Sequence, residues 1–385
     1  MSKSIYLDWN ATAVVRPEAA QAVMRALELG GNPSSVHAAG RAARAVMEDA
    51  REAVAALIGA AAANVVFTSG GAEANNLAID SAVATGSRRL IVSAIEHPTI
   101  LEAARASSAE VEYLPVDRRG VADLDWLRER LARWDAADGR PFVALMLANN
   151  ETGVVQPVRE AADIVHAAGG WLHVDAIQAV GKIPVGMDAQ GADTLTLSGH
   201  KLGAPQGVGV LAFGPGATLV RRQHGGGHER GRRAGTENVP GIAGLGAAAR
   251  LAAEHLADAG AQAAWRDAAA ERLKAAGAVV MGDGAPRLPN TLQVAAPGFP
   301  GDLQVVALDL AGVMVSAGSA CSSGKMKASH VLTAMDQGEL AGCAIRVSGG
   351  WGTTEADWNR FADAWLEAHQ RHAARRAPAA AGAEA

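Results

Sequence analysis

Lys201 is the side chain whose position in this sequence most directly indicates chemistry. It lies just after the apolar run 194–198, and a lysine at the end of a buried strand is not expected to be a solvated surface charge. Burial and neighbouring cations lower the pKa of an amine, which suits a lysine that forms a Schiff base. Asp175 ends the preceding apolar run, 171–175, where a carboxylate is costly unless it has a cationic partner. One strand–helix–strand step separates the two residues, so we expect them to flank one cationic ring.

Three weaker clusters follow other apolar runs. Gly71 and Ala72 lie at a junction between a strand, a glycine turn and a helix, and the free N–H groups of such a helix start suit a phosphate. His97 is placed to stack on an aromatic cofactor ring or to move protons, and Asn150 is placed to donate to a phenolate-type oxygen. Each also has an ordinary interpretation, as a glycine-rich turn, a structural histidine and an Asx-type turn. All five clusters together predict one cofactor site.

Alternating apolar runs and helical stretches should position these side chains. The runs are rich in Val, Ile and Leu, and most are separated by enough residues for a helix: 65–68, 90–93, 111–114, 142–148, 171–175, 194–198 and 207–213. This alternation predicts a largely parallel sheet with helices on both faces. The last two runs are close in sequence, which allows an antiparallel edge. In open parallel sheets, ligands bind beyond the carboxyl ends of the strands, where the polar clusters fall.

The pattern changes after residue 240. A long Ala-rich helical stretch, 242–276, leads into a second region of strands and helices that extends to about residue 371. We therefore expect a large α/β domain at 12–255 and a smaller α+β domain. The smaller domain should comprise residues 1–11 together with 256–372. Residues 373–385 are mainly Ala, Arg, Pro and Gly without apolar periodicity and are expected to form a disordered tail.

Composition excludes several classes of function. The net charge of −5 among 385 residues argues against a general affinity for nucleic acid or anionic lipid. No segment has the pattern of a signal peptide or an uncharged apolar run long enough for a membrane helix. The 2 cysteines are too few for a disulfide framework, so a cytoplasmic location is expected.

Cys321 lies in a segment of small residues, 316–324, in which nothing favours packing into a core. Free cysteines are usually buried and inert, so a thiol in a Ser/Gly-rich loop indicates chemistry. An accidental exposed thiol is the ordinary alternative. Cys343 lies in an apolar, strand-like run and is expected to be structural.

Four further motifs extend these clusters along nearly the whole chain. They are Leu-Asp-Trp-Asn-Ala-Thr at 7–12, Asn-Pro-Ser-Ser-Val-His at 32–37, the glycine- and arginine-rich segment 225–238, and Ile-Arg-Val-Ser at 345–348. Together with the five clusters, they resemble the NifS/IscS-like cysteine desulfurases of the class V aminotransferase family. The resemblance implies the fold type I architecture of enzymes that use pyridoxal phosphate (PLP), with a large, mostly parallel sheet domain and a smaller α+β domain.

The resemblance also implies roles around the cofactor ring. Lys201 would hold PLP as a Schiff base, and Asp175 would pair with the pyridine nitrogen, which keeps the ring an electron sink. His97 would stack on the ring and assist proton transfer. Asn150 and Gln178 would contact the ring substituents, with Gln178 near the phenolic oxygen.

Further residues would bind the phosphate and the substrate. The phosphate would be held by Gly71, the backbone of Ala72, Ser198, His200 and, across a homodimer interface, Thr236. The family usually has Thr where this chain has Ala72, so one hydroxyl donor is missing, which should weaken cofactor binding by roughly 1.5–3 kcal/mol if nothing replaces it. Arg346, with Asn150, would bind the substrate carboxylate as a planar bidentate donor. A surface ion pair is the ordinary alternative for this arginine.

The implied reaction removes sulfur from L-cysteine and leaves L-alanine. Lys201 would take the α-proton, and the Cys321 thiolate would attack the substrate sulfur to form a persulfide. The sulfur would pass to an iron–sulfur scaffold or a thiolation carrier. No resident metal is expected, although Cys321 would be available as a transient ligand of a nascent iron–sulfur cluster. The alternatives are another class V enzyme, namely a selenocysteine lyase or an aminotransferase, and a non-catalytic scaffold that retains the fold. A loop thiol favours the desulfurase over the aminotransferase.

Overall fold

A seven-stranded sheet forms the centre of the larger part of the protein. The computed structural model describes residues 4–317 and 329–376, and of residues 255 and 258 the backbone only. Along the chain, the strands are β2 (Val65–Thr68), β3 (Arg89–Ser93), β4 (Glu110–Leu114), β5 (Phe142–Ala144), β6 (Trp171–Asp175), β7 (Thr194–Ser198) and β8 (Gly209–Phe213). Their spatial order is β2-β8-β7-β6-β5-β3-β4, and within this sheet β8 runs in the direction opposite to the other six strands.

Two details of this sheet differ from the expectation. The antiparallel strand is not at the edge, because β2 adds to the outer side of β8. The run 142–148 forms a regular strand only as far as Ala144. The residues that follow stay attached to β6, since the N–H groups of Leu145 and Leu147 donate to carbonyls of that strand. Hydrophobicity alone marks such a segment as buried, but it does not show where the ladder ends.

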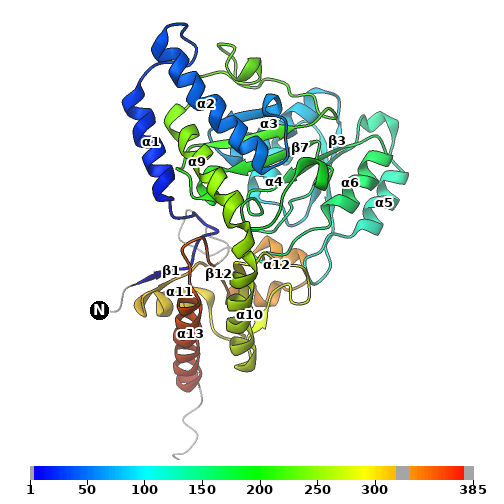
Figure 1. The fold of residues 1–385 in the computed structure, drawn as a ribbon. Coiled ribbons are helices and arrows are strands. Elements are labelled where there is room, and N and C mark those ends of the chain that lie inside the picture. The colour runs from blue at the N-terminus through cyan, green and yellow to red at the C-terminus, as the bar shows by residue number, and fades with distance from the viewer. Residues whose placement is uncertain (1–3, 318–328, 377–385) are drawn as a thin grey trace, which may run out of the picture.

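Helices cover both faces of the large sheet (Figure 1). The helices of this part are α1 (Pro17–Leu29), α2 (Ala38–Leu57), α3 (Gly71–Ala84), α4 (Pro98–Ala106), α5 (Leu124–Ala132), α6 (Val158–Ala167), α7 (Met187–Gln190), α8 (Gly199–Leu202) and α9 (Val239–His255). Side chains of α3 and α4 share one core cluster with the sheet, whereas α2, α5, α6 and α9 contribute to the core on the other face. Burial on both faces explains why the strands are continuously apolar.

Alternation along β6 directs its polar side chains to one face. Leu172 and Val174 belong to the core on the α2 and α9 side, and Trp171 belongs to the core on the α3 and α4 side. Because successive side chains of a strand point to opposite faces, His173 and Asp175 share the face of Trp171. Both therefore point toward α3, where the cofactor cluster begins.

The smaller part of the protein contains two further sheets. A three-stranded antiparallel sheet has the order β12-β10-β9, and a two-stranded parallel sheet joins β1 to β11. The strands are β1 (Ile5–Tyr6), β9 (Val279–Val280), β10 (Thr291–Ala295), β11 (Val313–Met314) and β12 (Ala344–Ser348). The helices are α10 (Ala259–Ala275), α11 (Gly301–Leu310), α12 (His330–Ala334) and α13 (Glu355–Arg376). A separate core unites the sheet with α10, α11 and α13 around Trp358, Phe361 and Trp365.

Two boundaries in this part correct the expectation. The single helix expected at 242–276 is interrupted, because a short 3-10 turn at Leu256–Asp258 separates α9 from α10; Figure 1 shows the two helices running from the large sheet to the smaller part. Helix α13 continues to Arg376, so residues 373–376 are helical rather than part of the tail. They are Ala and Arg, which rank high in helix propensity. Residues 377–385 lie outside the described residues, and the division into two domains stays a prediction.

Candidate active site

A cavity of about 370 Å³ lies at the carboxyl ends of the central strands, within the roughly 300–1,000 Å³ typical of small-molecule sites. The structure brings ten of the residues expected from the sequence to its walls: Gly71, Ala72, His97, Asn150, Asp175, Gln178, Ser198, His200, Lys201 and Arg346.

In the described stretches, no helix combines the length and apolar character needed to cross a membrane. These same stretches contain no group of three or more His, Cys, Asp or Glu side chains arranged to hold a metal ion.

Lys201 enters the cavity from α8, a single helical turn that directly follows β7. Its Nζ donates to the backbone carbonyls of Asn10 and Ala11, the latter at 2.7 Å. Burial, followed by the positive charge of Arg346, lowers the pKa of Lys201 to about 8. About a tenth of this amine is therefore neutral at pH 7, and the neutral amine is the form that attacks a carbonyl carbon.

Asp175 is buried at the carboxyl end of β6. Its Oδ1 accepts from the N–H of Ile177 at 2.9 Å, and its Oδ2 accepts from Asn75 Nδ2 at 2.8 Å. Burial raises the pKa of this carboxyl group. In the described residues, no basic side chain forms an ion pair with Asp175, so the site lacks the direct cationic partner that would keep the buried carboxylate ionised.

Asn75 links Asp175 to two further groups. This buried α3 residue donates to both Asp175 Oδ2 and Thr99 Oγ1, and its Oδ1 lies 3.1 Å from His173 Nε2. The other nitrogen of His173 lies 2.9 Å from Thr194 Oγ1, and burial lowers the pKa of His173 to about 3. The neutral imidazole therefore donates to Asn75, which fixes the amide with its NH2 group toward Asp175. The alternating pattern of β6 places His173 and Asp175 on one face, but we did not predict this network from the sequence.

His97 caps the N-terminus of α4. The backbone N–H of Thr99 donates to His97 Nδ1 at 3.2 Å, and Thr99 Oγ1 lies 2.9 Å from the same nitrogen. Burial lowers the pKa of His97. Since Nδ1 accepts a hydrogen bond, the neutral ring carries its proton on Nε2. Thr99 thereby connects the orientation of this ring to Asn75 and Asp175.

The start of α3 packs closely against the turn that follows β6 and against the end of β7. A Cβ atom on Gly71 would lie 2.3 Å from Ile177 Cδ1 and 3.5 Å from Ser198 Cβ, so only glycine fits here without rearrangement. The first N–H groups of a helix lack partners within the helix and attract anions. Ser198 ends β7 nearby, and burial lowers the pKa of His200 to about 4. His200 Nδ1 lies 3.3 Å from Thr12 Oγ1.

Asn10 connects the N-terminal segment to the cavity. Its backbone carbonyl accepts from Gln178 Nε2 at 3.0 Å as well as from Lys201. Its Nδ2 donates to Thr291 Oγ1 at 3.0 Å and to the Asn150 carbonyl at 3.4 Å. The motif at 7–12 contributed to the family resemblance, but its sequence gave no indication that Asn10 contacts the lysine.

Arg346 is a buried residue in the middle of β12. It donates to Asp8 Oδ1 at 2.8 Å and to the Asn150 carbonyl at 3.0 Å. The arginine is therefore ion-paired but not on the surface, contrary to the ordinary alternative considered from the sequence. A guanidinium has five N–H groups, four of them on the two terminal nitrogens, and these two contacts use one N–H of each terminal nitrogen. Donor capacity thus remains for an anionic ligand.

Of the two other expected residues, Thr236 lies at another cavity, and Cys321 is not described by the structure. Thr236 lines a separate, smaller cavity with Ser69 and Arg233, near the start of α3, where Arg233 forms an ion pair with Glu73 at 2.6 Å. Cys321 lies outside the described residues. The chain on either side of its segment is anchored at the site: Ser316 and Arg346 exchange two backbone hydrogen bonds, at 2.7 and 3.1 Å. On the other side, Ser329 Oγ donates to Glu151 Oε2 at 2.7 Å.

The cavity offers complementary groups to one kind of ligand. The cavity is faced by the Lys201 amine, whose pKa is lowered to about 8, by the buried carboxyl group of Asp175 and by the helix start at Gly71. These would meet an aldehyde, a basic ring nitrogen and a phosphate, respectively. Arg346 adds a cation for a second, anionic ligand beside the first.

Comparisons with known proteins agree with this chemistry. The model of the class-V aminotransferase family matches residues 5–361. A cysteine desulfurase of Gluconacetobacter diazotrophicus is 42% identical over 372 residues, which is 94% of this chain and 92% of the relative. The cysteine desulfurase IscS of Dictyoglomus turgidum is 39% identical, with 94% of each chain covered.

A solved structure extends the agreement to the fold. The X-ray structure of a NifS-like protein from Rickettsia africae superimposes with a TM-score of 0.88 at 31% identity, covering 95% of this chain and 99% of the other. These matches confirm both the family resemblance and the fold class expected from the sequence motifs. The chain therefore belongs to the class-V aminotransferase family, together with relatives that bear the name cysteine desulfurase.

Proposed function

We propose that this protein is a PLP-dependent cysteine desulfurase, which converts L-cysteine to L-alanine and retains the sulfur as a persulfide on Cys321. The observation that carries the proposal is the meeting of Lys201, Asp175 and Arg346 in one cavity. Relatives named cysteine desulfurase match the chain over most of its length, which supports this reaction over others of the family.

The residues of the cavity suit the cofactor. Lys201 would bind the aldehyde carbon, Asp175 the pyridine nitrogen, and His97 the face of the ring. The phosphate would be held by Gly71, the backbone of Ala72, Ser198 and His200, with Thr236 contributed by the partner subunit of a homodimer. Asn150 and Gln178 would contact the ring substituents. When bound, pyridoxal phosphate supplies a cationic ring that accepts the electron pair released at the substrate α-carbon.

The side chains of the protein would bind the substrate and move its protons. Arg346 and Asn150 bind the carboxylate of L-cysteine, so that its α-carbon faces Lys201. The lysine has a pKa lowered to about 8, and its neutral amine would take the α-proton of the substrate. His97 carries a proton on Nε2 when neutral and assists proton transfer at the ring.

Cys321 would perform the sulfur transfer. Its thiolate attacks Sγ of the substrate, an S–S bond forms, and the bond between Cβ and Sγ breaks. The electron pair of that bond remains with the substrate carbons, which gain protons to become L-alanine, and the sulfur stays on Cys321. The anchoring of Ser316 beside Arg346 and of Ser329 on Glu151 supports this role, because both flanks of the segment lie at the site.

The direct test is to follow the sulfur. The protein is incubated with L-cysteine, and peptides are analysed by mass spectrometry under non-reducing conditions. We expect one added sulfur atom on Cys321, and we expect Cys321→Ser to lose sulfide release while keeping the visible absorbance of bound cofactor. Cys343→Ser is the matched control and should behave like the wild type. Sulfide release at the wild-type rate from Cys321→Ser would overturn the persulfide step.

The same preparation separates the competing functions. A selenocysteine lyase would turn over selenocysteine much faster than cysteine, and an aminotransferase would produce a keto acid rather than alanine and sulfide. A non-catalytic scaffold would remain colourless when PLP is added. We expect a coloured protein that releases sulfide from cysteine.

The wider setting of the protein follows from the proposed reaction. We expect a homodimer in the cytoplasm that passes sulfur to an iron–sulfur scaffold or a thiolation carrier. The large cofactor domain would comprise residues 12–255, and the small domain residues 1–11 with 256–372. Gel filtration coupled to light scattering tests the dimer, and transfer of labelled sulfur to candidate acceptors tests the recipient.

A further inference from the structure

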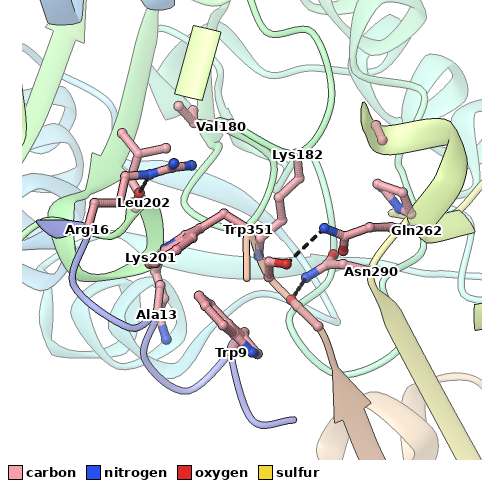
Figure 2. Close-up of a pocket in the computed structure, with 15 residues that line it drawn as sticks. Trp9, Ala13, Arg16, Val180, Lys182, Lys201, Leu202, Gln262, Asn290 and Trp351 are labelled. Carbon is pink, nitrogen blue, oxygen red and sulfur yellow. Dashed lines mark hydrogen bonds between the residues drawn. The ribbon is translucent and has the colours of Figure 1, made fainter. Parts of the chain in front are cut away.

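A second lysine, Lys182, lies next to the proposed cofactor site. It belongs to the turn that follows β6, and its Nζ donates to Gln178 Oε1 at 2.7 Å and to Asn10 Oδ1 at 3.0 Å. Lys182 lines a second cavity of about 90 Å³ together with Lys201 and Asn290 (Figure 2). Gln178 lines the larger cavity, as does Lys201. The Lys182–Gln178 contact thus links the second cavity to the cofactor cavity.

No ordinary ion pair explains this lysine. Within the described part of the chain, no carboxylate lies within ion-pairing distance of Lys182, and the charges that act on it are the like charges of Lys201 and Arg346. Burial, followed by these two cations, lowers its pKa well below the usual value. A neutral amine still has two N–H groups, which matches its two acceptors. An apolar side chain would fill the same space without the free-energy cost of burying a polar group. The presence of an amine here is therefore explained by its two hydrogen bonds.

These hydrogen bonds fix the orientation of the Gln178 amide. Its Nε2 donates to the Asn10 carbonyl, which can only accept, and its Oε1 accepts from Lys182. Both partners therefore favour the same orientation, and one N–H of Gln178 is left for the cofactor cavity. Asn10 is fixed in the same way, because its Oδ1 accepts from Lys182 and from Asn290 Nδ2, the latter at 3.3 Å.

We infer that Lys182 is a positioning residue of this active site, which holds the Gln178 amide so that its NH2 group faces the bound cofactor. The inference rests on the proposed function only in that PLP binds at Lys201, with its phenolic oxygen near Gln178. A donor to that oxygen stabilises the form in which the adjacent Lys201 nitrogen has lost its proton. Without Lys182, only the Asn10 carbonyl still favours this orientation, so the amide turns its own oxygen toward the cavity more often and this stabilisation is reduced.

The test is a pH titration of the visible absorbance of the purified holoenzyme without substrate. We expect Lys182→Met to raise the midpoint of the titration by about one pH unit, the scale of one hydrogen bond to a charged group. Lys274→Met is the matched control, because Lys274 pairs on the surface with Glu271 and Asp283, and it should leave the midpoint unchanged. A midpoint in Lys182→Met equal to that of the wild type overturns the inference.

A double-mutant cycle tests whether Lys182 acts through Gln178. We expect Gln178→Leu to raise the midpoint, and Lys182→Met to add no further shift in that background, because linked residues are non-additive. An additive shift overturns the inference. If Lys182→Met does not fold, Lys182→Leu replaces it, since its side chain has no N–H group for either acceptor. An unchanged midpoint, or a shift that persists beside Gln178→Leu, then overturns the inference. A wild-type protein that binds no PLP would instead contradict the proposed function.

Discussion

The two sides of the active-site cavity differ in whether their ionisable groups are shifted toward the neutral form or held in an ion pair. On the cofactor side, at the strand ends of the large sheet, burial shifts each pKa toward the neutral form: it lowers the pKa of Lys201 to about 8, lowers that of His97 and raises that of Asp175. On the substrate side, Arg346 is paired with Asp8 in a charged contact of 2.8 Å. The cofactor side therefore favours a ligand that brings its own charges, and the substrate side already holds a cation for an anionic ligand.

The two sides also differ in how the chain builds them. The cofactor side draws on one sheet and the turns that follow its strands, where residues such as Asp175 and Lys201 come from neighbouring strands. The substrate side combines Asp8, Asn150 and Arg346, which are far apart in the sequence. Variants on one side should therefore leave ligand binding on the other side largely intact, whereas the pKa of Lys201 depends on both sides, because the charge of Arg346 lowers it.

The largest effect is expected on the substrate side. Arg346→Gln should lower kcat/KM for L-cysteine by about 10²–10⁴-fold, because the carboxylate loses a bidentate, charge-assisted contact. The absorbance of bound cofactor should remain. Asp8→Asn, which keeps the arginine, is the control for loss of the ion pair. An equal loss in both variants would assign the effect to the ion pair and not to substrate binding.

The pH dependence of cofactor binding tests the cofactor side. The pKa of Lys201 is lowered to about 8, and only the neutral amine attacks an aldehyde. The rate at which cofactor-free protein regains absorbance should thus rise about tenfold per pH unit below pH 8 and level off above it. Stopped-flow absorbance measures this rate. A rate that keeps rising to pH 10.5, the ordinary pKa of lysine, would contradict the lowered value.

A substitution in the Asn75 network tests the contacts on the cofactor side more directly. Asn75→Ala removes a donor to Asp175 and leaves His173 and Thr99 each without one partner, so the affinity for PLP should fall by roughly 10–100-fold. Asn76→Ala is the matched control, since Asn76 is exposed and donates only to the Ala72 carbonyl among the described groups. Equilibrium titration of cofactor-free protein measures both affinities, and equal losses would contradict a role for the network.

The smallest effect concerns the missing hydroxyl at the start of α3. Ala72→Thr should tighten PLP binding by about tenfold, because the hydroxyl adds a donor to the phosphate at a partly solvated position. Ala72→Val has nearly the same shape without the hydroxyl and should not tighten binding. If the valine variant binds equally tightly, shape and not hydrogen bonding accounts for the gain.

The sequence by itself determined the family, the mostly parallel sheet, and the strand ends that carry Asp175 and Lys201. It could do so because strand burial leaves continuous apolar runs, and because polar residues that end such runs are conspicuous. It also singled out Cys321, which lies outside the described residues, so the role of that thiol stays a prediction.

Only the tertiary structure decided the contacts between these side chains. Asn75 and His173 lie about 100 residues apart and meet because α3 packs on the face of β6 that also carries Asp175. The interior position of β8 and the pairing of Arg346 with Asp8 depend likewise on distant segments. Lys182 is similar: its role could not be predicted from the sequence, because its amine contacts Asn10 only in the folded chain. A sequence pattern records which residues are buried or polar, whereas hydrogen-bond partners depend on packing between elements, which local periodicity does not encode.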